Sequence, residues 1–100
     1  MRIIFSKVAS RSYENILEFL SQTWTEKEMG IFIDEAEKVT NQLKEGKFLL
    51  FQKYSKDIRS ALIGKKHVRM FFRKESETKI KVLLFFDMRQ DPQKILELLQ

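Results

Sequence analysis

The side chains in this sequence that could do chemistry are mainly arginines and lysines. Residues 47–74 carry nine basic side chains and one acid, Asp57, so this segment has a net charge of +8 within a chain of +5. Positioned cations bind phosphates and carboxylates, and they can stabilise charge that develops on a reacting phosphate. The asymmetry therefore favours a polyanionic partner, and the alternative is a solvated basic surface that binds nothing.

Composition excludes several kinds of reactive site. The sequence has no cysteine, so disulfides, thiolate zinc sites and cysteine nucleophiles are impossible. His67 is the only histidine, and beside Lys65 and Lys66 in a turn it is expected to be solvated, without the partners that acid–base or metal chemistry needs. Neither a Gly-rich phosphate loop nor a carboxylate cluster with metal spacing occurs. We therefore expect no metal and no cofactor.

Arg89 lies where a rigid frame would hold a side chain. It follows the apolar run Val82 to Phe86 and precedes Asp91-Pro92, a pair typical of a helix start. Residues between a strand end and a helix start often carry function. The alternative is a local ion pair of Arg89 with Asp87 or Asp91.

Two helices are predicted near the start of the chain, after a short strand at residues 2–5. The first helix begins after Ser6 and is expected to end near residue 23, because its apolar residues recur at spacings of 3 and 4. Thr25 and Glu28 form the T-x-x-E capping box that starts the second helix, which Gly46 would end. So short a connection predicts an antiparallel helical hairpin.

Three strands and a closing helix are predicted in the second half. Residues 48–57 have no clean period and read as an irregular connection with at most a short helical turn. Strands are expected at 58–63, 68–73 and 80–86, joined by turns at 64–67 and 74–78 into an antiparallel meander. A short helix follows, with Asp91 as N-cap and Pro92 at its first position. The prediction is one α+β domain over residues 1–100.

Alternation along the strands predicts two faces of this meander. One face, expected to pack on the helical hairpin, carries Ile58, Ser60, Leu62, Val68, Met70, Phe72, Ile80, Val82, Leu84 and Phe86. The other carries Arg59, Arg69, Arg73 and Lys81 between Phe71 and Phe85, a mixture that suits phosphates and bases or an acidic peptide. The alternative is that the closing helix covers the apolar part and the arginines only rim it.

Several short stretches along the chain are similar in sequence and in order to those of one protein family. They are Ile3-Ile4-Phe5-Ser6 with Ala9, Ile16-Leu17-Glu18-Phe19-Leu20 with Trp24, Phe32-Ile33, Ile58-Arg59, Lys66-His67 and Phe86-Asp87-Met88-Arg89-Gln90-Asp91-Pro92. With these stretches the chain resembles the RelE/ParE superfamily, the toxins of bacterial type II toxin–antitoxin pairs, and most of all their plasmid-stabilisation, ParE-like branch. The resemblance implies a β-α-α-β-β-β fold. It also implies an antitoxin whose acidic, partly disordered tail folds around the toxin.

The resemblance implies two possible mechanisms, contact with DNA gyrase and cleavage of messenger RNA, and the residues favour contact with gyrase. ParE-like relatives are thought to act on DNA gyrase by protein–protein contact, without a catalytic set. RelE-like relatives cut messenger RNA on the ribosome with several basic residues and usually a tyrosine near the C-terminus; Arg59, Arg73 and Arg89 could supply the cations. However, no tyrosine follows Asp87, and the second strand has Phe71 and Phe72. A third possibility is a non-toxic relative that only binds its antitoxin.

In each case we expect the partner-binding residues to be Arg59, Lys65, Lys66, Arg69, Arg73, Lys81, Phe71, Phe85 and Arg89. The N-terminus has no apolar core of the kind found in signal peptides, and the longest apolar run, Val82 to Phe86, is too short to span a bilayer. A cytoplasmic protein in a hetero-oligomer with its antitoxin is therefore expected.

Overall fold

A five-stranded sheet occupies the centre of the molecule, in a computed structural model that describes residues 1–64 and 67–99. The strand order is β1-β5-β4-β3-β2; β1 runs parallel to β5, and the other neighbours are antiparallel. The elements are β1 (Arg2–Phe5), α1 (Lys7–Leu20), α2 (Glu26–Lys44), the 3₁₀ turn η1 (Phe48–Leu50), β2 (Gln52–Ser55), β3 (Ile58–Ile63), β4 (Val68–Ser76), β5 (Lys79–Asp87) and α3 (Gln93–Leu98).

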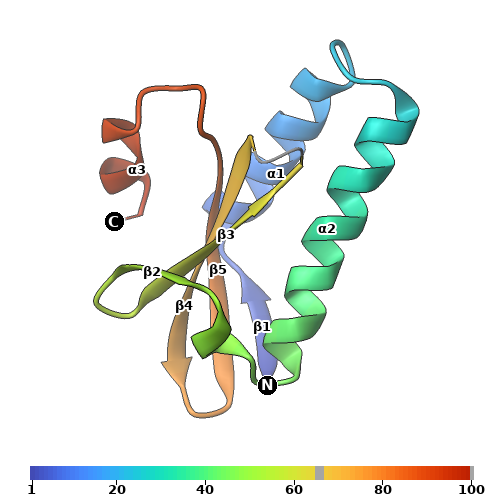
Figure 1. The fold of residues 1–100 in the computed structure, drawn as a ribbon. Coiled ribbons are helices and arrows are strands. Elements are labelled where there is room, and N and C mark those ends of the chain that lie inside the picture. Colours follow the sequence, from blue (N-terminus) through green and yellow to red (C-terminus); the bar gives the residue numbers. More distant parts are fainter. Residues whose placement is uncertain (65–66, 100) are drawn as a thin grey trace.

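Helices cover both faces of this sheet, which confirms the α+β class. Figure 1 shows α1 and α2 side by side on one face and α3 on the other. Between the sheet and the α1–α2 hairpin lies the main core, built around buried residues such as Phe32, Leu43, Met70 and Phe72. A smaller core lies under α3 and consists of the buried residues Phe71, Leu83, Leu84, Phe86 and Ile95.

Both helix starts have the predicted caps. The Ser6 hydroxyl accepts a hydrogen bond from the Ala9 N–H at 2.9 Å. At α2, the Thr25 N–H donates to the Glu28 carboxylate at 3.1 Å, and the Glu28 N–H donates to the Thr25 hydroxyl at 3.2 Å. The first helix ends at Leu20, earlier than predicted, because residues 21–24 form turns in which the N–H groups of Thr23 and Trp24 both donate to the Leu20 carbonyl.

Replacing Thr25 by alanine is expected to lower the free energy of unfolding by about 1 kcal/mol, because an orphan N–H of α2 loses its acceptor. Urea denaturation measures this change, and Thr23→Ala serves as the control because Thr23 is exposed and precedes the cap. Equal stabilities of the two variants would contradict a role for the capping box.

The sheet is larger than the predicted three-stranded meander. Strands β3, β4 and β5 form the expected antiparallel core, but β1 joins it in parallel at one edge and β2 extends it at the other. The short turn η1 falls within the connection predicted at residues 48–57, whereas β2 contradicts the irregular reading of its second half. All four side chains of β2 are exposed, so the strand has no apolar alternation that sequence could reveal.

A β-bulge overturns the predicted faces of the second half of β5, whereas Ile80 and Val82 pack in the main core as predicted. Phe71 pairs with Leu84 and Phe72 pairs with Val82, so Leu83 is the extra residue. Beyond this bulge the alternation is inverted. As a result, Leu84 and Phe86 pack under α3, and Phe85 packs in the main core, opposite to the prediction in each case.

The predicted faces of β3 are also reversed. Arg59 is opposite Phe72 in the register, which places Arg59 on the side of the helical hairpin. Ile58, Ser60 and Leu62 consequently face α3. The physical reason is that Ile63, the most deeply buried residue of β3, packs in the main core, and Arg59 lies on the same face of the strand as Ile63.

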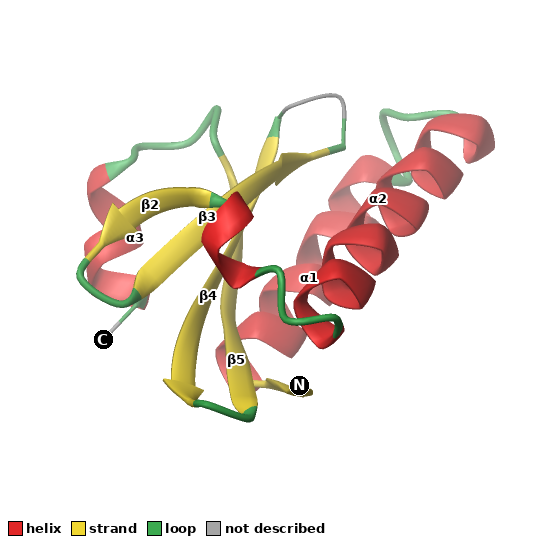
Figure 2. Ribbon diagram, turned by 60° about the horizontal axis from the view of Figure 1, so that its bottom comes forward, coloured by secondary structure: helices red, strands yellow, loops and turns green. Residues whose placement is uncertain are grey.

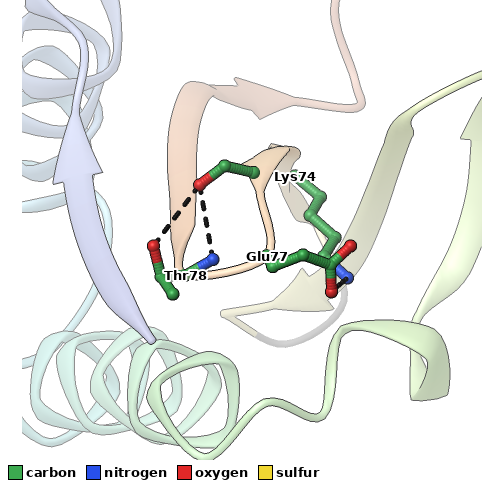
Figure 3. Close-up of polar contacts among 4 residues, drawn as sticks. Lys74, Glu77 and Thr78 are labelled. Atoms are coloured by element: carbon green, nitrogen blue, oxygen red, sulfur yellow. Dashed lines mark hydrogen bonds and ion pairs between the residues drawn. The ribbon is translucent and has the colours of Figure 1, made fainter.

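The turn between β4 and β5 is shorter than the predicted 74–78, because β4 continues three residues beyond its predicted end, to Ser76, and β5 begins one residue earlier, at Lys79. Figure 3 shows Lys74 against Glu77, an ion pair of 3.5 Å, near Thr78. At the last helix Pro92 is the N-cap, but Asp91 still performs the capping because its carboxylate accepts the Gln93 N–H at 3.0 Å.

Candidate functional site

Three of the predicted cations lie at the rim of α3. Arg69, Arg73 and Lys81 share the sheet face that α3 covers, and α3 lays Ile95 over the apolar middle of that face. Arg73 is directly opposite Lys81. Arg69 lies four residues along β4, about 13 Å away. This is the alternative arrangement that the sequence allowed, in which the helix covers the apolar part and the cations surround it; we call Arg69, Arg73 and Lys81 the cationic rim.

Arg69 is held by two neighbouring strands. Its Nη1 donates to the hydroxyl of buried Ser60 on β3 at 2.8 Å and to the side-chain oxygen of Gln52 on β2 at 3.2 Å. Both bonds use the same nitrogen, and a guanidinium has five N–H donors. Arg69 is therefore oriented by the fold and keeps donors with which to bind a carboxylate or a phosphate.

The other end of the rim concentrates positive charge. Arg73 and Lys81 are cross-strand neighbours of like charge, an arrangement that is unfavourable without an anion nearby. Glu75 supplies part of the negative charge that this pair needs, since its two carboxylate oxygens lie 3.2 and 3.5 Å from the Arg73 guanidinium. The hydrogen bond from Arg73 and the charges of Arg73, Lys81 and Lys79 outweigh desolvation and lower the pKa of the Glu75 carboxyl.

Arg89 forms the local ion pair with Asp87 that the sequence allowed. Its Nε and Nη2 donate to the two oxygens of buried Asp87 at 3.0 and 2.7 Å, and its backbone N–H adds a third bond of 2.9 Å. These bonds lower the pKa of the Asp87 carboxyl and raise that of Arg89. His67, which is half-buried in the turn before β4, also lies close enough to contribute to the lowered pKa of Asp87.

The Asp87 pair predicts acid sensitivity. Because the folded pKa of Asp87 is lowered, its contribution to stability is present above the unfolded pKa of about 3.9 and is lost as the pH falls through the folded value. We expect Asp87→Asn to cost about 1–2 kcal/mol at pH 7, at the lower end for a charged hydrogen bond because Arg89 is half exposed. Thermal unfolding between pH 7 and 2 measures both. The variant should lose stability less steeply below pH 4 than the wild type, with Glu75 accounting for part of the remaining slope; identical slopes would contradict this.

Besides Arg89, two predicted site residues lie away from the rim. Phe71 is fully buried beneath α3, so it cannot contact a partner, and two other residues cannot be placed. Arg59 donates to the carbonyl oxygens of Phe51 at 2.7 Å and Leu49 at 3.5 Å, on the side of the helical hairpin. Phe85 is buried in the main core. The predicted residues Lys65 and Lys66 fall outside the described residues. The predicted set is therefore divided between the two sides of the sheet by the register of β3 and the bulge in β5.

Tyr54 is a residue beside the cationic rim that the sequence reasoning missed. Its ring packs edge-on against Phe71 with 4.9 Å between centroids, from the exposed strand β2. Gln52 on the same strand contacts Arg69, so Tyr54 lies on the face of the cationic rim. The sequence signal for this position was weak, because Tyr54 is a single tyrosine between Lys53 and Ser55, in a stretch whose apolar residues have no regular period.

The site is suited to binding anions and has few groups for catalysis. The rim offers two oriented guanidinium groups and the ammonium group of Lys81, whereas the acid beside it, Glu75, is engaged in an ion pair with Arg73. Over residues 1–64 and 67–99, no group of three His, Asp or Glu side chains could hold a metal ion. None of the helices in these residues combines the length and apolar character that a membrane crossing needs. Binding of a carboxylate-rich or phosphate-rich surface is what the geometry supports.

Comparison with known proteins adds no assignment. No protein-family model matches the sequence, and no curated protein matches it significantly. The functional argument therefore depends on the residues themselves.

Proposed function

We propose that this chain is the toxin of a cytoplasmic type II toxin–antitoxin pair, of the RelE/ParE kind, that binds DNA gyrase. The order of a strand, a helical hairpin and a series of antiparallel strands supports the proposal, since it agrees with the fold that the family resemblance implies. The chain adds the edge strand β2 to that pattern.

The observation that carries this proposal is how the arginines are used. A nuclease without metal would need several cations to converge on one phosphate. Arg59 lies on the opposite side of the sheet from Arg73, and Arg89 is bonded through three contacts to Asp87. This separation favours a toxin that acts by contact with a protein target.

The cationic rim also supports the proposed antitoxin. An extended acidic tail could pass around α3 from Lys81 and Arg73 to Arg69. The two ends are about 13 Å apart along β4, and because α3 covers the direct line, the tail would need more than the roughly four residues that this distance alone requires. Binding of this kind would be weakened by salt. A tail that is disordered when free would fold as it binds.

Expression in bacterial cells tests the toxin assignment. Induction of the chain alone is expected to stop growth, and co-expression of a neighbouring gene for a small protein with an acidic tail is expected to restore it. Unaffected growth at a level of folded protein visible on a gel would overturn the toxin assignment and favour the relative that only binds its antitoxin.

A second candidate is cleavage of ribosome-bound messenger RNA, and Tyr54 is the observation that favours it. A ring packed against Phe71 near Arg69 could stack on a base or orient a 2′-hydroxyl. This reading predicts cleaved message in a cell-free translation reaction, and loss of cleavage in Arg59→Ala, Arg89→Ala or Tyr54→Phe. Unchanged translation at saturating protein would exclude it.

A further inference from the structure

A groove between α1 and α2 has apolar walls and an acidic rim. It has a volume of about 370 Å³ and is lined by Phe5 and Ile33, which are 44% and 40% exposed. The exposed carboxylates of Glu14 and Glu37 also line it. Burial and the nearby Glu37 carboxylate raise the pKa of Tyr13 in the same groove, so Glu37 faces into it. Such a groove fits an apolar side chain flanked by cations.

The groove lies on the acidic part of the chain. Residues 25–46, which include α2, carry six acids and three basic side chains, a net charge of −3. An acidic segment would be repelled here, so the groove is a poor site for the tail proposed to follow the cationic rim. The two surfaces are thus chemically opposite.

The turn η1 carries the most exposed large apolar side chains of the described residues. Leu49 and Leu50 are 77% and 73% exposed. In Figure 2, η1 is the short red turn between α2 and β2. We call Leu49 and Leu50 the leucine knob; the exposed residues Lys47 and Lys53 flank it in the sequence.

The leucine knob is held rigidly. Beneath it, the rings of Phe48 and Phe51 pack edge-on against Phe72, at 6.0 and 5.2 Å between centroids. The Arg59 guanidinium lies 5.5 Å from the Phe48 ring and donates to the backbone oxygen of Leu49, within the knob, and to that of Phe51, directly after it. Ordering the turn on binding therefore costs little, as expected of an interaction element.

We propose that the leucine knob of one molecule docks in the α1–α2 groove of a second copy of this chain. Leu49 and Leu50 would cover Phe5 and Ile33, while Lys47 and Lys53 approach Glu14 and Glu37. Both halves of the contact, apolar with cations and apolar with acids, are present on this chain, and that complementarity selects a second copy over an acidic protein. The inference does not depend on the proposed function.

Sedimentation velocity of the full chain tests the contact. A knob and one groove make a small interface, so association is expected at about 10–500 µM. Leu49→Ser with Leu50→Ser should raise the dissociation constant about tenfold or more, the change expected from one buried leucine. Leu96→Ser is the matched control, since Leu96 is 61% exposed on α3. It should associate like the wild type.

The groove is tested by Glu14→Lys with Glu37→Lys, which should also raise the dissociation constant about tenfold. Glu18→Lys with Glu97→Lys makes the same change in net charge at exposed positions outside the groove lining, and it should have a smaller effect. Mixing the knob variant with the groove variant should give a two-chain species, because one intact knob and one intact groove remain. Circular dichroism melts confirm that each variant is folded.

Three outcomes would overturn the proposal. The wild type could stay monomeric over the whole concentration range, a folded knob or groove variant could associate as well as the wild type, or the mixed variants could fail to pair. Binding to vesicles of anionic phospholipid provides a separate test. If the wild type binds them through Leu49 and Leu50 while staying monomeric in solution, the knob contacts a lipid surface and the second copy is excluded.

Discussion

Replacing Gly64 by alanine is expected to lower the free energy of unfolding by about 2–5 kcal/mol, combining backbone strain with overpacking. Gly64 has a φ of +59°, and a Cβ there would lie 2.6 Å from Cδ1 of Phe32 and 3.1 Å from Cη2 of Trp24. Phe32 is fully buried and cannot move aside without disturbing the main core. The Gly64 N–H, which donates to Glu35 at 3.0 Å, ties the end of β3 to α2 and would shift as well.

Gly46→Ala separates the two causes. Gly46 has a φ of +83°, but its nearest contact to an added Cβ is 4.0 Å, at Cγ of Met1. It should therefore lose only about 1–2 kcal/mol, for the left-handed backbone alone. Chemical denaturation of both variants measures the difference. Equal losses would show that the close packing of Gly64 on Phe32 does not carry the effect.

If the proposed antitoxin binds the cationic rim, reversing the charge of two rim cations, Arg73→Glu with Lys81→Glu, is expected to weaken its binding about a hundredfold at low salt. Steering by complementary charge can raise association rates by a factor of 10–10³ over neutral surfaces. The two residues face each other across β4 and β5, so the variant exchanges a like-charged pair of cations for one of anions. Glu75, which offsets the charge of Arg73 in the wild type, would lie beside two carboxylates in the variant, so a melt must show that the variant is folded before its binding is compared.

Lys27→Glu with Lys38→Glu is the matched control. Both lysines are exposed on α2, across the sheet from α3, and the double change alters net charge by the same amount. Surface plasmon resonance at low and high salt should show a loss of association rate for the rim variant that salt reduces. A similar loss in both variants would mean that overall charge, and not the cationic rim, governs binding.

The helices were predictable because their signals are local. The capping box at Thr25 and Glu28, the Ser6 cap and the left-handed Gly46 each depend on a few adjacent residues. The positions of β3, β4 and β5 were also predicted, since each contains apolar residues that enter a core. By contrast, β2 is exposed throughout and is defined only by its pairing with β3.

The candidate site was only partly predictable because it depends on register. A single extra residue, Leu83, sends Phe85 to one side of the sheet and Phe86 to the other. Spacing along β5 cannot reveal a bulge, which forms only against β4. Likewise, Arg59 could be assigned a face only when its partner across the ladder was known to be Phe72. The cations that were predicted to lie on one surface are therefore divided between the two faces of the sheet.

Supercoiling of relaxed plasmid by purified DNA gyrase, with the chain added up to saturation, tests the proposed function most directly. The proposal predicts inhibited supercoiling or trapped cleavage complexes, relieved by the antitoxin. Full supercoiling activity at saturating concentrations of folded protein would contradict it.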